Sequence, residues 1–140
     1  MILVDSSVWI GFFNGEDCME TAHLADCIGD GRPLTLPGVV LTEVLFGVKN
    51  DAEARRVTHA LSAYPLAPDL TAADYERAAQ IHRTCRSRGR TVRSVIDCLI
   101  AQLCLREGYE LLAKERDFDA IASTFPLKRS PPRNGAHDRL

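Results

Sequence analysis

The chain has 140 residues, of which 46% are hydrophobic and 26% charged, with nine glycines and seven prolines. The length suits one domain with its own hydrophobic core, and the composition excludes a disordered, collagen-like or fibrous chain. The 17 lysines and arginines against 19 acidic residues give a net charge of −2, so any nucleic acid or anionic membrane must be bound by a local basic patch.

Two further features bear on where the protein works. No apolar run approaches the roughly 18 residues that cross a bilayer, and the first residues, MILVDSSVW, lack the positive charge that begins a signal peptide. The five cysteines form no CxxC pair, and their odd number indicates reduced thiols. We therefore expect a cytoplasmic protein with no membrane partner.

Short apolar runs separated by amphipathic segments predict strands that alternate with helices. Residues 2–4 are apolar and end at Asp5, as expected for a buried parallel strand. Thr71 and Asp74 form a capping box, Ser94 caps a later helix, and Gly108 ends it. Strands are expected at 2–4, 34–36, 109–113 and 127–129, and helices at 8–14, 18–28, 37–48, 52–63, 72–88, 95–107 and 118–125.

Strands joined through helices imply right-handed crossovers and a mostly parallel sheet that is covered on both faces. The predicted fold class is therefore α/β, in three α/β/α layers. We assign residues 1–129 to one domain. Residues 130–140, SPPRNGAHDRL, are polar and rich in proline and glycine, and are expected to form a mobile tail.

Acidic residues follow the predicted strands, where open α/β sheets gather their functional groups. Asp5 follows the first strand, and Glu115 and Asp117 follow strand 109–113. Asp97 and Glu43 lie on helices instead, among the apolar residues that face the core. An unpaired carboxylate in such a place is costly. A shared Mg²⁺ or Mn²⁺ would explain both acids, because these ions prefer carboxylate and water oxygens.

Each acid also has a purely structural explanation. Asp97 lies in a first helical turn, where it would complement the helix N-terminus. Glu43 could pair with an arginine, and Asp5 could simply form the turn after its strand. The joint presence of the three favours a metal site.

Four segments occur in order along the chain: VDSSVW, TEVLFG, RSVIDCLIAQL and LLAKERDFDAIA. Together they resemble the PIN-domain ribonucleases, most closely the VapC-like toxins of bacterial toxin–antitoxin pairs, over residues 1–129. The resemblance implies a Mg²⁺- or Mn²⁺-dependent endoribonuclease with four acidic residues. The first three fall on Asp5, Glu43 and Asp97.

The fourth acid falls in ERDFD, which offers Glu115 and Asp117, and Glu115 departs from the usual Asp of the family. We expect Asp117, because it precedes an apolar helix whose N–H groups it can cap, whereas Glu115 is longer and lies between two basic residues. Ser6 occupies the Ser or Thr position after the first Asp. It is expected to orient Asp5 or bind a metal-bound water, or else to cap the helix.

Residues 83–93, RTCRSRGRTVR, hold five arginines and no acid, directly before the helix with Asp97. Such cations would hold RNA phosphates beside an acidic site, although a solvated helix end is the alternative explanation. We assign RNA binding to Arg86, Arg88, Arg90 and Arg93.

The resemblance also implies partners: an RNA substrate, a cognate antitoxin and a second copy in a homodimer. The apolar helix with Val8, Trp9 and Phe12 would suit such an interface. Two other functions stay open. A receiver-like signalling domain also places an Asp and Mg²⁺ at a strand end. Such a domain requires paired acids after its first strand, whereas Asp5 is followed here by two serines. A catalytically silent RNA-binding fold would lack acids that are all present here.

Overall fold

The structure, a computed structural model, describes residues 1–132, so most of the predicted tail lies outside the described residues. Every predicted strand and helix is present, with ends that differ by at most three residues. In chain order the elements are β1 (Ile2–Val4), α1 (Ser6–Phe13), α2 (Met19–Gly29), β2 (Leu34–Thr35), α3 (Gly38–Phe46), α4 (Asp51–Leu61), α5 (Ala72–Ser87), α6 (Val95–Glu107), β3 (Glu110–Leu112), α7 (Arg116–Ala122) and β4 (Lys128–Arg129).

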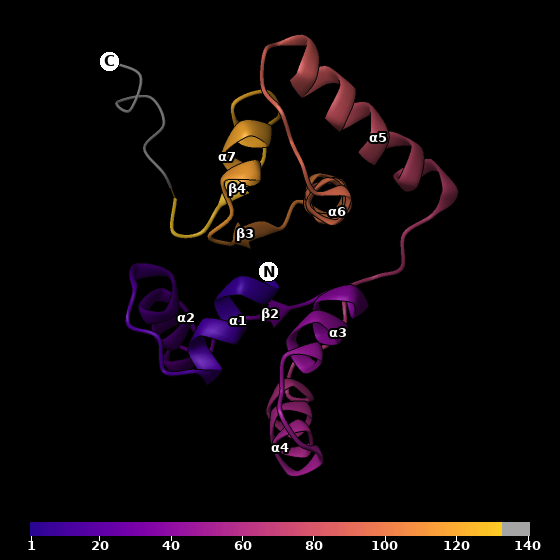
Figure 1. The fold of residues 1–140 in the computed structure, drawn as a ribbon. Helices are drawn as coiled ribbons and strands as arrows, with labels where there is room; N and C mark the ends of the chain where they lie inside the picture. The colour runs from indigo at the N-terminus through magenta and orange to yellow at the C-terminus, as the bar shows by residue number, and fades with distance from the viewer. Residues whose placement is uncertain (133–140) are drawn as a thin grey trace.

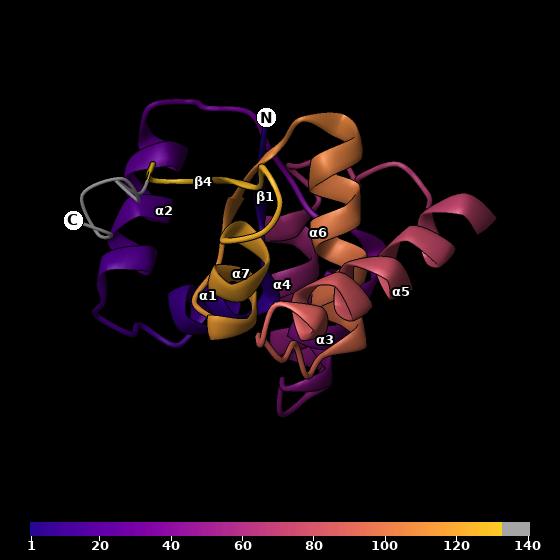
Figure 2. The same ribbon diagram turned by 90° about the horizontal axis from the view of Figure 1, so that it is seen from above.

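The strands form one parallel sheet in the order β2-β1-β3-β4. Leu3 in β1 pairs with Thr35 on one side and with Leu111 on the other. Helices α1 to α4 lie on one side of the sheet, and α5 to α7 lie on the other (Figure 1, and Figure 2 from above). The predicted three-layer α/β/α fold is therefore confirmed.

The place where the sheet changes direction lies between β1 and β3. From β1 the chain passes to β2 on one side, and it returns to β3 on the other side. The two strands end level, because Val4 pairs with Leu112 and the Asp5 N–H donates to the Leu112 carbonyl at 2.9 Å. Ligands of open α/β sheets bind in the crevice beyond such a point. Asp5 lies at the edge of this crevice, directly after β1.

The predicted caps hold. Thr71 and Asp74 form the capping box of α5, and the Ser94 hydroxyl oxygen accepts from the Asp97 N–H at 3.1 Å. Gly108 has a left-handed backbone, φ 71°, at the end of α6. Local side-chain chemistry therefore sets the ends of these helices.

Helix α1 differs from the prediction in its start and in its role. It begins at Ser6 because Asp5 is its N-cap and accepts from the Ser7 N–H. Val8 and Trp9 are fully buried in the core of this same chain, and Trp9 stacks on Phe13. The suggestion that Val8 and Trp9 form a dimer interface is therefore wrong, because the monomer already covers them.

The folded part extends past the predicted boundary at residue 129. Ser130 is only 3% exposed, and its N–H donates to the Leu111 carbonyl at 2.9 Å. Its hydroxyl lies 2.9 Å from His23 Nε2 in α2. In residues 1–132 no helix is long and apolar enough to cross a membrane, and all five cysteines are free thiols.

Candidate active site

Five acidic side chains from four parts of the chain meet beyond the carboxyl ends of β1 and β3. Asp5 is the N-cap of α1 and Glu115 that of α7, and Asp97 and Asp117 lie in the first turns of α6 and α7. Glu43 comes from α3. Their charges act on one another: Glu115, Asp117 and Glu43 all help to raise the pKa of Asp97. The acids predicted from sequence are thus brought together.

Asp5 and Glu115 share the hydroxyl of Ser7. Ser7 Oγ lies 3.0 Å from Asp5 Oδ2 and 2.8 Å from Glu115 Oε2. A serine hydroxyl has one hydrogen, so it can donate to only one of these carboxylates at a time. The other contact is satisfied when that carboxyl carries a proton itself. This agrees with the pKa of Asp5, which burial first, and then the charge of Glu115, raises to about 7.

Asp97 is the second buried carboxyl. It is 7% exposed, and burial together with the charges of Glu115, Asp117 and Glu43 raises its pKa to about 7. The alternative explanation from the sequence is that Asp97 merely complements the helix N-terminus. The three neighbouring acids do not fit that simple role, because they make the charge of Asp97 costly.

Glu43 is held by α3 at the side of this cluster. Its Oε1 is buried, and within residues 1–132 no hydrogen-bond partner reaches it. The alternative of an arginine partner for Glu43 is therefore not realised among the described residues. A buried oxygen without a donor is a group that a cation would satisfy.

Asp117 has a different neighbourhood. Its Oδ2 accepts from the backbone N–H groups of Arg93 and Ser94, each at 3.0 Å. The expectation that Asp117 caps the helix after it is wrong, because the N-cap of α7 is Glu115. Asp117 instead ties α7 to the loop before α6. That contact fixes the start of the helix that presents Asp97.

The serine expected at the site was Ser6, but the hydroxyl that contacts Asp5 is that of Ser7. Ser6 takes the first position of α1, and Asp5, not a serine, caps the helix. A second carboxylate 108 residues away completes the contact. Since helix geometry turns successive side chains by 100°, only one of the two serines can face both acids.

The predicted basic segment flanks the acidic cluster. Arg86, Arg88, Arg90 and Arg93 are all exposed, at the end of α5 and in the loop that follows. The loop is anchored at both ends: the Arg90 N–H donates to the Cys85 carbonyl at 2.9 Å, and His82 Nδ1 donates to the Val92 carbonyl at 2.9 Å. The four arginines are thus carried on a fixed backbone, which is tied to Asp117 at Arg93.

The donor set suits a hard divalent cation. All five groups offer carboxylate oxygens, the ligands that Mg²⁺ and Mn²⁺ prefer, and Glu43 Oε1 is buried without a donor. As the side chains stand, no three Asp, Glu, His or Cys groups within the described part of the chain are arranged to hold an ion. Binding would require the carboxylates to rotate toward a common point.

Comparison with known proteins agrees with the fold. The sequence matches the PIN domain family over residues 2–123. It is 30% identical over 129 residues, 91% of this chain and 96% of the relative, to the VapC ribonuclease Mb1587 of Mycobacterium bovis and, equally, to the ribonuclease VapC11 of Mycobacterium tuberculosis. The ribonuclease VapC51 of Mycobacterium tuberculosis is 36% identical over 81 residues, 58% of each chain.

A solved structure shares the fold. It is the crystal structure of VapBC2 from Rickettsia felis bound to a DNA fragment from their promoter, with a TM-score of 0.70, 16% identity, and coverage of 92% of this chain and 97% of that one. The protein is thus of the α/β class, with a carboxylate cluster at the switch point of its parallel sheet. The chain belongs to the PIN-domain family. The resemblance to VapC-like toxins is confirmed, and the receiver-like alternative is not supported.

Proposed function

We propose that the chain is a metal-dependent endoribonuclease that acts as the toxin of a toxin–antitoxin pair. The observation that carries the proposal is the cluster of five acids, in which Asp5 and Asp97 are buried and both have a pKa raised to about 7. Such a cluster is costly to a folded protein unless it serves a ligand. Relatives that align with almost the whole chain are named as ribonucleases.

The acids would hold one or two ions of Mg²⁺, with Mn²⁺ as a substitute. Asp5, Asp97, Glu43 and Asp117 would supply the ligands, with Glu115 as a further candidate. A bound divalent ion supplies a Lewis acid that activates water and neutralises charge on the phosphodiester. Other side chains of the protein would hold the acids in place: the Ser7 hydroxyl contacts and orients Asp5 and Glu115.

The basic loop would hold the RNA backbone next to the acids. Arg86, Arg88, Arg90 and Arg93 supply the positive charge that the cluster lacks, and arginine forks match phosphate oxygens. We also propose a cognate antitoxin and a second copy of the chain as partners. Apolar side chains are available for such contacts, among them Phe46 on α3, which is 90% exposed.

The proposal is tested by Asp97→Asn with Asp26→Asn as the matched control. Asp26 is exposed on α2. We expect Asp97→Asn to reduce cleavage of mixed single-stranded RNA in Mg²⁺ or Mn²⁺ by at least about 100-fold, since several kcal/mol of charge stabilisation depends on the ion. Asp26→Asn should cleave like the wild type, and EDTA should stop both.

Thermal melting checks that each variant is folded. A fully active Asp97→Asn protein would overturn the metal-nuclease assignment. Wild-type protein that binds RNA but never cleaves it in either metal would favour the catalytically silent alternative.

A further inference from the structure

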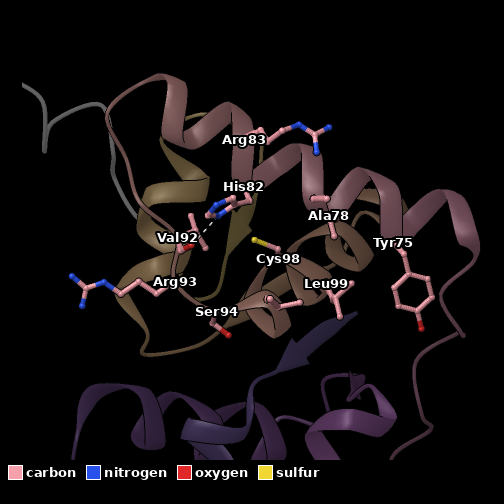
Figure 3. A pocket seen from close by; sticks show the side chains of 11 residues that line it. Tyr75, Ala78, His82, Arg83, Val92, Arg93, Ser94, Cys98 and Leu99 are labelled. Carbon is pink, nitrogen blue, oxygen red and sulfur yellow. Dashed lines mark hydrogen bonds between the residues drawn. The ribbon is translucent and has the colours of Figure 1, made fainter.

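A cavity of about 550 Å³ lies between α5 and the start of α6, outside the acidic cluster. Its floor is apolar, with Ala78, Cys98 and Leu99 facing each other across the two helices (Figure 3). Its volume lies within the range of about 300 to 1,000 Å³ that small-molecule sites show. No residue of the acidic cluster lines it, so the site described above does not account for it.

One wall of the cavity is the segment that leads to the acids. Val92, Arg93 and Ser94 line the cavity, and the Arg93 and Ser94 N–H groups donate to Asp117. The Ser94 hydroxyl also accepts from the Asp97 N–H. The cavity and the acidic cluster are therefore two sides of one short stretch of backbone. The segment Val92 to Ser94 thus connects the cavity to the acids through hydrogen bonds.

The charge around the cavity is positive. Arg83 and Arg93 belong to its lining, and the lining contains no acidic residue. Arg86, Arg88 and Arg90 extend the positive surface along the loop. An apolar cavity with a cationic rim complements a group that is flat and apolar but attached to phosphates.

A second copy of the chain fits this cavity poorly. A two-fold contact places the same patch on both sides, so the arginines Arg83 and Arg93 would face one another across it without an acid in the lining to pair with them. The free face of Tyr75, which is 55% exposed, lies at the far end of the cavity from Arg93 (Figure 3). An aromatic face is a surface on which a base stacks.

We propose that this cavity binds an unstacked base of single-stranded RNA, next to the phosphate held at the acidic cluster, while Arg83 and Arg93 contact the flanking phosphates. The inference rests on the proposed nuclease function and names how that site takes its substrate. The cavity thereby makes cleavage depend on the base at one position, whereas the arginines act on any sequence.

The first test measures binding without chemistry. The four ribonucleoside 5′-monophosphates are titrated into the wild-type protein in EDTA while the methyl resonances of Val92, Val95 and Leu99 are followed by NMR. We expect these resonances to shift with the nucleotides, more with some bases than with others, and not with ribose 5-phosphate or inorganic phosphate. Equal shifts with ribose 5-phosphate, or no shifts, would overturn the proposal.

The second test fills the cavity mouth. Ala79 lines the cavity and is exposed on α5, and Ala73 is exposed on the same helix but does not line it. Ala79→Trp should weaken the binding of a short single-stranded RNA in EDTA by about 5- to 150-fold, the range that loss of one stacked base gives. Ala73→Trp should bind as the wild type does. Equal effects of both substitutions would contradict a base site.

Two results separate this inference from the nuclease assignment. Nucleotide-dependent shifts in a protein that never cleaves RNA with Mg²⁺ or Mn²⁺ would keep the base site and remove the nuclease. Cleavage that Ala79→Trp leaves unchanged in rate and in base preference would keep the nuclease and remove the base site. Methyl shifts that follow protein concentration without any nucleotide would show that a second copy covers the cavity, and would also overturn the proposal.

Discussion

At the scale of single residues, Glu115 and Asp117 divide between two tasks that the sequence left undistinguished. Glu115 reaches Asp5 through the Ser7 hydroxyl, and its charge is the largest of the neighbouring charges that raise the pKa of Asp5 and of Asp97. Asp117 holds the backbone of Arg93 and Ser94. Glu115 therefore acts on the cluster directly, and Asp117 acts partly through the loop.

Glu115→Gln and Asp117→Asn should differ in what they damage. We expect Glu115→Gln to reduce metal-dependent cleavage strongly with little change in melting temperature, because its side chain holds no backbone. Asp117→Asn should reduce cleavage and also lower the melting temperature measured in EDTA, since an amide oxygen accepts the two N–H groups less strongly than a carboxylate. RNA cleavage rates and thermal melts of both variants check this.

Asp26→Asn, on the exposed face of α2, is the matched comparison for loss of one acidic charge. A Glu115→Gln protein with wild-type cleavage, or an Asp117→Asn protein with an unchanged melting temperature, would contradict this division. The prediction that Asp117 is the fourth metal ligand stays a proposal, and Glu115 is an equally strong candidate for that ligand.

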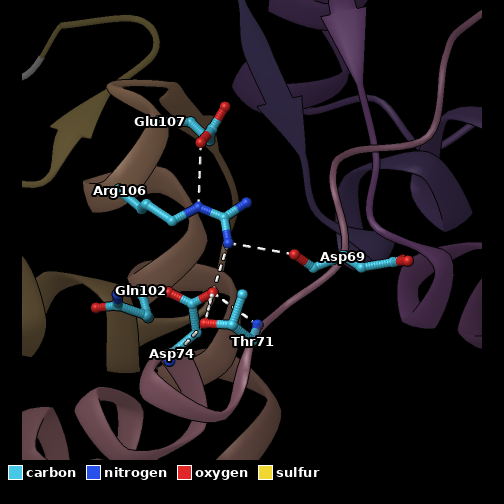
Figure 4. A network of polar contacts seen from close by, with 6 residues as sticks. All are labelled: Asp69, Thr71, Asp74, Gln102, Arg106 and Glu107. Atoms are coloured by element: carbon cyan, nitrogen blue, oxygen red, sulfur yellow. Dashed lines mark hydrogen bonds and ion pairs between the residues drawn. The ribbon is translucent and has the colours of Figure 1, made fainter.

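At the scale of elements, α5 is fastened to α6 by a network around Asp74 (Figure 4). Asp74 is 2% exposed and accepts from the Thr71 N–H at 2.8 Å, from Gln102 Nε2 at 3.0 Å, and from Arg106. These hydrogen bonds, first those from the Thr71 backbone, hold the pKa of Asp74 well below its usual range. The network closes the end of the α5–α6 pair away from the basic loop.

Arg106→Gln should lower the melting temperature by several degrees, because it removes a charged donor from a buried carboxylate. In an Asp74→Asn protein the same substitution should cost much less, since the two groups share one interaction. Glu76→Gln, exposed on the same helix, is the control. Thermal melts of the four proteins of this cycle measure the coupling, and additive losses would show that the pair is not coupled.

The basic loop is expected to act as one element in RNA binding. Changing Arg86, Arg88, Arg90 and Arg93 together to Ala should weaken binding of single-stranded RNA and reduce its salt dependence by roughly 0.7 log units per lost phosphate contact. Binding in EDTA over a series of salt concentrations measures this slope. An unchanged slope would return the arginines to the alternative of a solvated helix end.

The elements themselves were largely predictable because their signals are local. Thr71 with Asp74, Ser94 and Gly108 set helix ends through groups within four residues of each other. The start of α1 was missed because Asp5, interpreted as a site residue or as the turn after its strand, is also the helix cap. Asp5 has both roles, and a sequence pattern that assigns it to the site gives no sign that it also caps the helix.

The site was predictable only in part, for a physical reason. Acids that follow neighbouring parallel strands must meet, so the gathering of Asp5 with Glu115 follows from topology. Which hydroxyl and which backbone they contact depends on pairs 23 to 108 residues apart, as with Ser94 and Asp117 or Ser7 and Glu115. The cavity was invisible in the sequence because its lining comes from two helices and the loop between them.

At the scale of the whole molecule, the buried carboxyls set how stability changes with pH. Asp5 and Asp97 have pKa values raised to about 7 in the folded protein, against 3.8 in an ordinary setting. An acid whose pKa is raised by folding does not lower the free energy of unfolding below about pH 4. It lowers that free energy progressively as the pH rises from about 4 toward 7. Asp74 has the opposite shift, so its contribution is present above about pH 4 and lost in stronger acid.

These opposing shifts predict that the metal-free protein is most stable near pH 4 to 5, below the usual maximum of about pH 5 to 8. Melting temperatures in EDTA across pH 2 to 9 should rise to that maximum, fall until about pH 7 and then level off. Each of the two acids should contribute up to about 4 kcal/mol to the fall in unfolding free energy, from about 1.4 kcal/mol for each unit of pKa.

Substitutions identify which group causes each limb of that profile. Asp5→Asn with Asp97→Asn should flatten the limb between pH 4 and 7 and leave the acid limb, whereas Asp74→Asn should flatten the acid limb alone.

Excess Mn²⁺ should raise the melting temperature of the wild type at pH 8, because an ion that binds only the folded state stabilises it and is attracted by the ionised acids. The doubly substituted protein should lose most of that increase. A wild-type profile that is flat between pH 4 and 7 in EDTA would mean that the acids do not form the charged, buried cluster on which the metal-nuclease proposal depends.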